Sequence, residues 1–255
     1  MRLLKLFIVL VVVCICHTAT AQTPNTWLQK ASLPDTGRAG AFAFSIGNKG
    51  YLGGGFNNGW QTFLKDFWEY DPATDTWTRK NDLPFGKRAL GISFSCNGKG
   101  YVGLGQDTLY FDSLYTDLWE YEPITDTWTQ KANFPGLGRR YAASFLIDTI
   151  GYVGTGESAA GNPLSDFWAY NTTTNIWQQK ANFIGTSRMT ATAFASSTKG
   201  YVGLGTDFFE TWKNDWYEYN PTIDAWLQKN NFPGTSRNFA LGLNINGKLF
   251  LGGEG

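Results

Sequence analysis

Short runs in which apolar and polar residues alternate recur along the chain and predict β-strands. Residues 66–70 and 117–121 alternate in this way around a central tryptophan. A second kind of run, at residues 50–55 and 100–105, is apolar and ends in glycines. A third kind of run starts at the arginine, as in residues 38–45, and is rich in small residues, as expected of an inner strand crowded by its neighbours. These patterns predict an all-β chain of many short strands.

A turn and a fourth strand complete the set. Residues 71–75 read Asp-Pro-Ala-Thr-Asp, and this is a turn signal because proline fixes φ and aspartate bonds its own backbone. Residues 76–80 follow and contain Trp77 and Lys80. A small-residue strand, a glycine-ended strand, an alternating strand and this last strand together predict a four-stranded antiparallel sheet.

The whole set repeats, because four residue types recur with the same spacings of 50, 51, 49 and 49 residues. The repeated positions hold Trp27, Trp77, Trp128, Trp177 and Trp226; Arg38, Arg88, Arg139, Arg188 and Arg237; Tyr51, Tyr101, Tyr152, Tyr201 and Phe250; and Lys30, Lys80, Lys131, Lys180 and Lys229. A period near 50 is typical of a propeller, in which sheets stack around an axis and bury each other's faces.

Composition supports this interpretation. The 255 residues include 11 Trp and 30 Gly, and only 16% are charged, which suits neither a coiled coil nor a disordered chain. Large rings such as Trp77 and Tyr101 are expected to fill the gaps between sheets. Cys96 occupies a strand position of the repeat, so we interpret it as a packing residue.

The N-terminus has the features of a secretory signal peptide. Arg2 and Lys5 precede an apolar run at residues 6–16, and residues 19–21 read Ala-Thr-Ala before Gln22. The run is shorter than the roughly 20 residues that a membrane span needs, although an uncleaved anchor is the alternative. We expect residues 1–21 to be removed, residues 22–255 to form the propeller, and the protein to be secreted, periplasmic or on the cell surface. We expect no stable membrane span.

Removal of residues 1–21 limits the available chemistry. The single histidine, His17, would be lost, and Cys96 would be the sole remaining cysteine. Without histidine the chain cannot form a Ser-His-Asp triad, a Cys-His dyad or a His-ligated metal site. The remaining 19 basic and 21 acidic residues give a net charge of −2, and no basic stripe indicates nucleic-acid binding. We expect no metal, no cofactor and no recognised catalytic residue.

The repeated arginine, the Gly-Tyr followed by paired glycines, the Tyr-Asp-Pro and the spaced tryptophans resemble the Kelch-repeat β-propellers. The resemblance covers residues 26–255 and is strongest to the secreted bacterial branch. The sequence departs from the family pattern where the glycines are split, as in Gly103-Leu-Gly105, and where Asp-Pro becomes Glu122-Pro123 or Asn171-Thr172. The resemblance implies a propeller whose blade repeats lie near residues 38–80, 88–131, 139–180 and 188–229.

The two ends of the array leave the blade number open. Residues 26–30 read as a fourth strand without a third, and residues 237–255 as a first and second strand without successors. Kelch-like rings often close by combining strands from both termini in one blade. Either the ring has five blades, the last a composite of these two segments, or Gly255 is not the natural C-terminus and the chain is a fragment of a six-bladed ring.

Residues that break the repeat are the best candidates for ligand contact. The loops between second and third strands vary most, and they share a face with the connections that end in the repeated arginines. We therefore predict a ligand site on this face that comprises Arg38, Arg88, Arg139, Arg188, Arg237, Trp60, Tyr110 and Trp212. Exposed aromatic residues and arginines dominate binding hot spots.

Each group has an alternative role. The aromatic side chains can instead cap the blade ends. The arginines can instead pair with Asp66, Asp117, Asp166 and Asp215, which recur once per blade. In Kelch adaptors that bind acidic peptides, an arginine at this position contacts the peptide, which is a positional resemblance only.

The predicted function is a secreted, non-enzymatic module that binds a protein or a glycan on the loop-rich face. The alternative is a carbohydrate-active enzyme, a glycosidase or sugar epimerase, that uses Glu157, Asp207 or Glu210. Kelch relatives include a copper galactose oxidase, whose metal needs histidine ligands, and a sialic-acid epimerase, whose motifs this sequence does not match. A third alternative is a structural module of a longer surface protein.

Overall fold

Five successive sheets form the part of the chain that the structure describes. The computed structural model describes residues 26–57, 59, 61–108, 114–245 and 248–253. Residues 31–255 make one compact unit, and the preceding residues make another. None of the described residues is helical. The predicted signal peptide, the boundary at Gln22, Trp60 and Tyr110 lie outside the described residues.

Four sheets have four antiparallel strands each, paired in the order first, second, third, fourth. The first sheet contains β1 (Phe42–Ile46), β2 (Lys49–Gly53), β5 (Phe67–Asp71) and β6 (Thr76–Lys80). The second contains β7 (Ile92–Cys96), β8 (Lys99–Gly103), β9 (Leu118–Glu122) and β10 (Thr127–Gln130). The third contains β12 (Ala143–Ile147), β13 (Ile150–Gly154), β15 (Phe167–Asn171) and β16 (Ile176–Lys180). The fourth contains β17 (Thr192–Ala195), β18 (Gly200–Gly203), β19 (Trp216–Asn220) and β20 (Ala225–Lys229).

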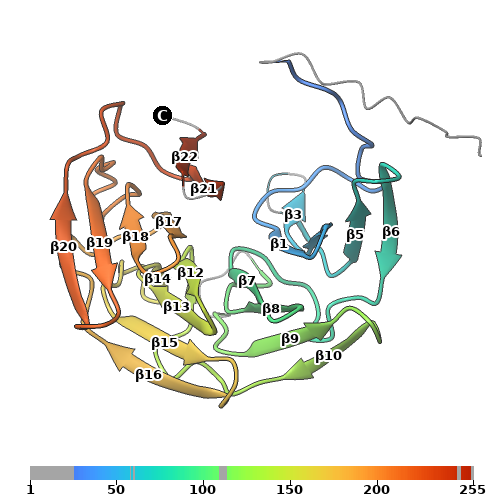
Figure 1. The fold of residues 1–255 in the computed structure, drawn as a ribbon, viewed down its shortest axis with the longest axis horizontal. Coiled ribbons are helices and arrows are strands. Elements are labelled where there is room, and N and C mark those ends of the chain that lie inside the picture. The colour runs from blue at the N-terminus through green and yellow to red at the C-terminus, as the bar shows by residue number, and fades with distance from the viewer. Residues whose placement is uncertain (1–25, 58, 60, 109–113, 246–247, 254–255) are drawn as a thin grey trace, which may run out of the picture. The chain divides into compact units, whose positions relative to one another are not determined.

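The fifth sheet has two strands, β21 (Leu241–Ile245) and β22 (Lys248–Gly252). Two small ribbons pair β3 (Phe56–Asn57) with β4 (Thr62–Phe63) and β11 (Arg139–Arg140) with β14 (Glu157–Ser158). Within the unit 31–255, the first strand of each sheet contacts the first strand of the next. Figure 1 shows β1, β7, β12, β17 and β21 on the inner side and β6, β10, β16 and β20 on the outer side. The expected all-β propeller architecture of four-stranded antiparallel blades is confirmed.

The apolar side chains of the fifth sheet are exposed. Leu241 is 62% exposed, whereas Ile92, at the matching place in the second sheet, is 2% exposed. Residues 26–30 belong to the other unit and contain no strand, so their pairing with residues 237–255 stays a prediction.

The prediction that the first strand starts at the repeated arginine is wrong. In the first sheet β1 begins at Phe42, because Gly40 adopts a left-handed conformation with φ of 62° and ends the extended run from Arg38. The equivalent residues are also left-handed, with φ between 51° and 61°: Leu90, Tyr141, Thr190 and Phe239. This bend turns the backbone toward the neighbouring sheet. Leu90 N donates to Gly40 O over 2.9 Å, and Tyr141 N donates to Leu90 O over 2.9 Å.

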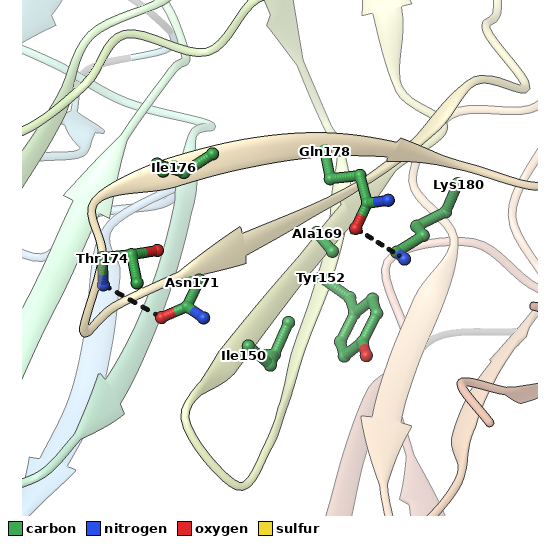
Figure 2. A pocket seen from close by; sticks show the side chains of 8 residues that line it. All are labelled: Ile150, Tyr152, Ala169, Asn171, Thr174, Ile176, Gln178 and Lys180. Carbon is green, nitrogen blue, oxygen red and sulfur yellow. Dashed lines mark hydrogen bonds between the residues drawn. The ribbon is translucent and has the colours of Figure 1, made fainter.

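The turns between third and fourth strands also join neighbouring sheets. In the third sheet, Asn171 Oδ1 accepts hydrogen bonds from the backbone N of Thr173 and Thr174, and Figure 2 shows the second of these. Asn175 Oδ1 closes the same turn by accepting from Tyr170 OH over 2.8 Å and from Ala132 N, in the preceding repeat, over 2.8 Å. The turn residues therefore shape the hairpin and fix it to its neighbour.

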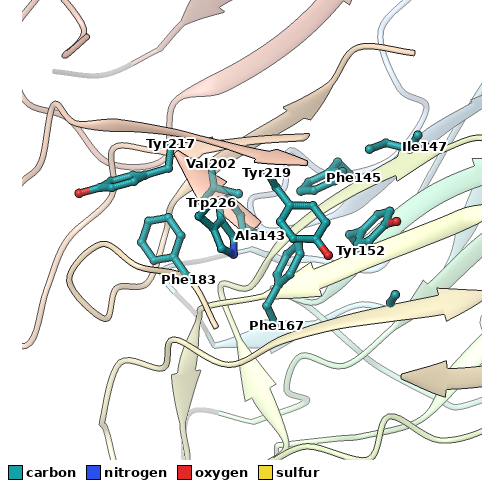
Figure 3. Packing of buried hydrophobic residues seen from close by; sticks show 11 residues of the cluster. Ala143, Phe145, Ile147, Tyr152, Phe167, Phe183, Val202, Tyr217, Tyr219 and Trp226 are labelled. Carbon is teal, nitrogen blue, oxygen red and sulfur yellow. The ribbon is translucent and has the colours of Figure 1, made fainter. Parts of the chain in front are cut away.

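Aromatic rings fill the gaps between sheets, as the sequence predicts. Between the third and fourth sheets, the Phe167 ring centroid lies 4.9 Å from those of Tyr219 and Trp226 (Figure 3). Phe67 contacts Tyr121 and Trp128 in the same manner between the first and second sheets. These rings leave no room for a side chain on some neighbouring strands. A Cβ at Gly200 would lie 2.0 Å from the Phe145 ring.

A buried arginine–aspartate pair occurs in every four-stranded sheet. Arg139 Nη1 and Nη2 each donate to a carboxylate oxygen of Asp166 over 2.7 Å, and Nη1 also donates to Thr155 O over 2.9 Å. Trp168 Nε1 donates to the same carboxylate. The other three pairs are Arg38–Asp66, Arg88–Asp117 and Arg188–Asp215. The predicted pairing of the repeated arginines with the repeated aspartates is therefore present in four blades.

The backbone of each arginine extends this link to the preceding sheet. Gly105 N, in the second blade, donates to Arg139 O over 2.9 Å, and Gly156 N, in the third, donates to Arg188 O over 2.8 Å. Gly105 has a φ of 82°, and a Cβ there would lie 2.3 Å from Ala89 O, so the close approach requires glycine. One residue thus ties together two strands of its own blade and the end of a strand in the blade before.

We predict that Arg139→Ala lowers the free energy of unfolding by about 3 kcal/mol, because it leaves Asp166 without its partner. The value is at the lower end for buried pairs because the Asp166 side chain remains 25% exposed. Chemical denaturation measures the change. Arg237→Ala is the matched control, because none of the described acidic residues pairs with Arg237. Equal losses in both variants would contradict a specific role for the pair.

The same pair predicts a dependence on pH. Burial raises the pKa of Asp166, but the hydrogen bonds and charge of Arg139 outweigh it and hold the pKa below the ordinary 3.8. The pair contributes its full stabilisation when the pH is above the pKa that Asp166 has in the unfolded chain. The stabilisation is lost as the pH falls through the lower pKa that Asp166 has in the folded chain. Asp166→Asn should therefore flatten the fall in unfolding free energy between about pH 5 and pH 2. An acid denaturation curve parallel to that of the unaltered chain would contradict this.

Candidate functional site

The predicted ligand-binding arginines lie beneath the surface. The side chains of Arg38, Arg88, Arg139 and Arg188 are between 0% and 3% exposed. Aromatic rings cover them, as where the Arg88 guanidinium lies 4.8 Å from the Phe85 ring centroid and 3.5 Å from that of Tyr115. A ligand would have to displace an aspartate to reach these guanidiniums, so the geometry favours the structural alternative.

Arg237 differs from the other four. Its Nη1 donates to Gly253 O over 3.2 Å and its Nη2 to Thr235 Oγ1 over 3.3 Å, and it is partly exposed. Trp212 is the predicted aromatic residue that the structure describes, and it is 45% exposed. It lies in the loop that leads from β18 to β19, opposite Thr206.

Trp212 lines a pocket of about 410 Å³ on the inner part of the loop-rich face, which we call the Arg140 pocket. Its lining residues come from the third, fourth and fifth repeats: Arg140, Tyr141, Glu157, Met189, Thr190, Thr206, Glu210, Trp212, Asn238 and Phe239. Next to it, the left-handed residues and the small residues after them line a hollow of about 240 Å³, to which all five repeats contribute.

A buried charged network forms the floor of the Arg140 pocket. Arg140 Nε donates to Glu157 Oε2 over 2.7 Å, and Arg140 Nη1 donates to Gln106 Oε1 over 2.9 Å. Arg140 and Glu157 face each other across the ribbon of β11 and β14. Gln106 is fully buried, and its Nε2 has no hydrogen-bond partner among the described residues. Thr206 Oγ1 is likewise buried and unpartnered.

These groups occupy positions where the repeat changes chemistry. The residue after the repeated arginine is apolar in three repeats and polar in two: Ala39, Ala89, Arg140, Met189 and Asn238. The residue after the glycine pair also varies: Phe56, Gln106, Glu157 and Thr206. Buried polar atoms without partners are rare in folded proteins and indicate a site for water or a ligand.

Aromatic rings form the wall of the pocket. The Tyr141 and Phe239 ring centroids lie 5.5 Å apart at an interplanar angle of 75°, and the Arg140 guanidinium lies 4.9 Å from the Tyr141 ring. Burial raises the pKa of Tyr141 to about 12, so its phenol stays protonated at neutral pH. The pocket thus combines hydrogen-bond donors, carboxylates and ring faces.

The three candidate catalytic carboxylates have different surroundings. Glu157 is buried against Arg140. Asp207 accepts hydrogen bonds from Lys213 Nζ over 2.6 Å and from the backbone N of Phe209 and Thr211, and the Lys213 bond above all lowers its pKa. Asp207 therefore shapes its own loop. Glu157 and Glu210 line the same pocket, and Asp207 does not.

Within the described ranges, no three His, Cys, Asp or Glu side chains gather so as to hold a metal ion. No helix among the described residues is long and apolar enough to cross a membrane. Cys96 is buried, with Sγ 3.5 Å from Thr172 Oγ1, as expected of a packing residue.

We predict that Trp212→Ala and Glu210→Gln each change the free energy of unfolding by less than about 0.5 kcal/mol, because exposed side chains outside the core contribute little. Differential scanning calorimetry of the two variants tests this. A loss as large as that of a buried core ring would show that these residues hold the blade end together, which is the capping alternative.

Comparisons with known proteins place this geometry in context. Residues 37–84, which span the first blade, match the family model described as the Kelch motif. One solved structure with a similar fold is titled "Structure of YjhT": it is 17% identical, the alignment covers 89% of this chain and 80% of that one, and the TM-score is 0.78. No curated protein matches the sequence.

Proposed function

From the premise that this chain is a Kelch-type β-propeller, we propose that it is a secreted, non-enzymatic module that binds a protein or a glycan through the Arg140 pocket. The observation that supports this most strongly is the buried network of Arg140, Glu157 and Gln106 beneath an exposed tryptophan. Most of these residues depart from the repeat, so the fold does not require them.

The lining favours a glycan. Aromatic faces such as Trp212 and Tyr141 stack on the apolar face of a sugar ring, while Glu157 and Thr206 supply polar groups for hydroxyls. A pocket of about 410 Å³ lies within the usual size range of small-ligand sites. One arginine and two glutamates line it, so its formal charge of −1 disfavours acidic ligands. A protein partner would instead insert a protruding side chain.

We expect the immobilised chain to bind neutral glycans when neutral, acidic and basic glycans are passed over it. Trp212→Ala should weaken the binding of a retained glycan by about 30-fold, as expected of a hot-spot ring. Ile223→Ala is the matched control, because Ile223 is an exposed apolar residue in the turn between β19 and β20. Calorimetric titration measures both. Equal affinities of the two variants would contradict the site, and retention of no glycan would contradict the ligand class.

A carbohydrate-active enzyme is the second candidate, because Glu157 and Glu210 line one pocket. Two carboxylates that face one sugar can serve as general acid and as nucleophile or base. Turnover of a glycan that is abolished in Glu210→Gln, with binding retained, would support the enzyme and contradict the non-enzymatic proposal.

We also propose that the protein is exported, because residues 1–21 contain a basic start, an apolar run and small residues in the order of a signal peptide. The intact mass of the product released by the native host tests it. A mass that corresponds to a chain starting at Gln22 supports a cleaved signal peptide, and a mass that corresponds to a chain starting at Met1 contradicts it.

A further inference from the structure

The first two blades contain a buried carboxylate with a fixed set of donors. In the first blade, Lys49 Nζ donates to Glu69 Oε1 over 2.5 Å and Tyr51 OH donates to Glu69 Oε2 over 2.8 Å. In the second blade, Lys99 Nζ and Tyr101 OH donate to Glu120 over 2.8 Å and 2.7 Å.

The repeated lysine of the fourth strand faces the same carboxylate. Lys131 Nζ lies 3.5 Å from Glu120 Oε2, and Lys229 Nζ lies 3.5 Å from Glu218 Oε2 in the fourth blade. Three blades thus place a glutamate where a tyrosine hydroxyl and a lysine amine can both reach it.

The third blade keeps the tyrosine and the fourth-strand lysine but lacks the glutamate. Tyr152 pairs with Ala169 across β13 and β15, in the register in which Tyr51 pairs with Glu69. Tyr101 and Glu120 show the same register in the second blade. Ile150 occupies the position of the other donor, Lys49, so this blade has lost one acidic and one basic group together.

A cavity of about 220 Å³ lies where the glutamate is missing (Figure 2). Tyr152, Ala169 and Lys180 line it. Tyr152 is only 4% exposed, and its hydroxyl makes no hydrogen bond with any described residue. Lys180 Nζ donates to the Gln178 side chain over 2.9 Å. Burial raises the pKa of Asp224, but hydrogen bonds from Tyr219 OH and Ala181 N and the charge of Lys180 lower it, so Lys180 is also near this aspartate. Two donors that serve a carboxylate in other blades therefore line a cavity in this one.

Acidic neighbours do not prevent an anion from binding here. Burial, Asp224 and Asp148 raise the pKa of Tyr152, so both aspartates lie near the site. The first blade has the same arrangement, because burial, Glu69 and Asp126 all raise the pKa of Tyr51. Between the first and second blades, a carboxylate is thus accommodated beside an aspartate, with a lysine to balance its charge.

We propose that the cavity of the third blade binds a free short-chain carboxylate in the place that Glu69 and Glu120 fill in their blades. Tyr152 OH and Lys180 Nζ donate to its oxygens. The atoms by which a glutamate side chain exceeds an alanine side chain are those of acetate, so acetate reproduces the missing group. The site is separate from the Arg140 pocket and does not depend on its function.

Acetate titration at constant ionic strength, with chloride replacing acetate in the reference, tests the proposal. Binding to the folded chain raises the melting temperature as acetate increases. Line broadening of ¹³C-acetate reports binding independently. Tyr152→Phe should weaken acetate binding by about tenfold or more, because a hydrogen bond to a charged group is lost. Tyr101→Phe is the matched control and should leave it unchanged.

Two further variants separate this site from general salt effects. Ala169→Glu restores the side chain of the other blades and should abolish the acetate response while raising the melting temperature without acetate. Glu120→Ala opens an equivalent cavity in the second blade and should acquire a second acetate response. Equal effects of acetate and chloride on the unaltered chain, or an undiminished acetate response in Ala169→Glu, would overturn the proposal. So would an acidic peptide that binds this cavity more tightly than acetate.

Discussion

The arginine that opens each of the four complete blades is the residue on which the rest of the structure depends. Its guanidinium binds an aspartate at the start of the third strand and a carbonyl at the end of the second, while its own carbonyl accepts a hydrogen bond from the preceding blade. Aromatic rings cover the ion pair, and a tryptophan or tyrosine completes the aspartate's bonds. A buried charge is tolerated because the guanidinium and the carboxylate hydrogen-bond to each other, and removal of either would leave the other unsatisfied.

Because these repeated groups are committed to one another, specific chemistry can arise only where a repeat departs from the pattern. Arg140 and Glu157 replace smaller or apolar residues beside the axis and produce a polar pocket. Ile150 and Ala169 replace a charged pair between the third and fourth sheets and produce a cavity. The first departure adds charged groups to the loop-rich face, and the second removes them from a junction between sheets. The uniform blades supply the rigid frame that holds both places.

The propeller, the strand order and the aromatic junctions could be predicted from the sequence, because each repeats in register. The arginine–aspartate pairs repeat in the same way, but they were only the alternative to ligand contact by the arginines. It did not predict the bend after the arginine, because left-handed Leu90 and Tyr141 have no sequence signature of the kind that glycine provides. It also missed Arg140, which directly follows the repeated Arg139. Only the structure shows that Arg139 binds Asp166, whereas Arg140 binds Glu157 and Gln106. The signal was present, because Arg140 is charged at a position that holds alanine in the first two repeats. The loss of Glu and Lys in the third repeat was also visible, but only strand register shows that Ala169 faces Tyr152.

The most direct test of the account is the free energy of unfolding of Arg139→Lys. Lysine retains the charge but cannot make two parallel hydrogen bonds to one carboxylate, and it cannot reach the Thr155 carbonyl with the same planar group. If the bidentate pair holds the blade together, the variant loses at least half of the stability that Arg139→Ala loses. If Arg139→Lys unfolds with the free energy of the unaltered chain, charge alone is sufficient and the arginine is not the residue on which the blades depend.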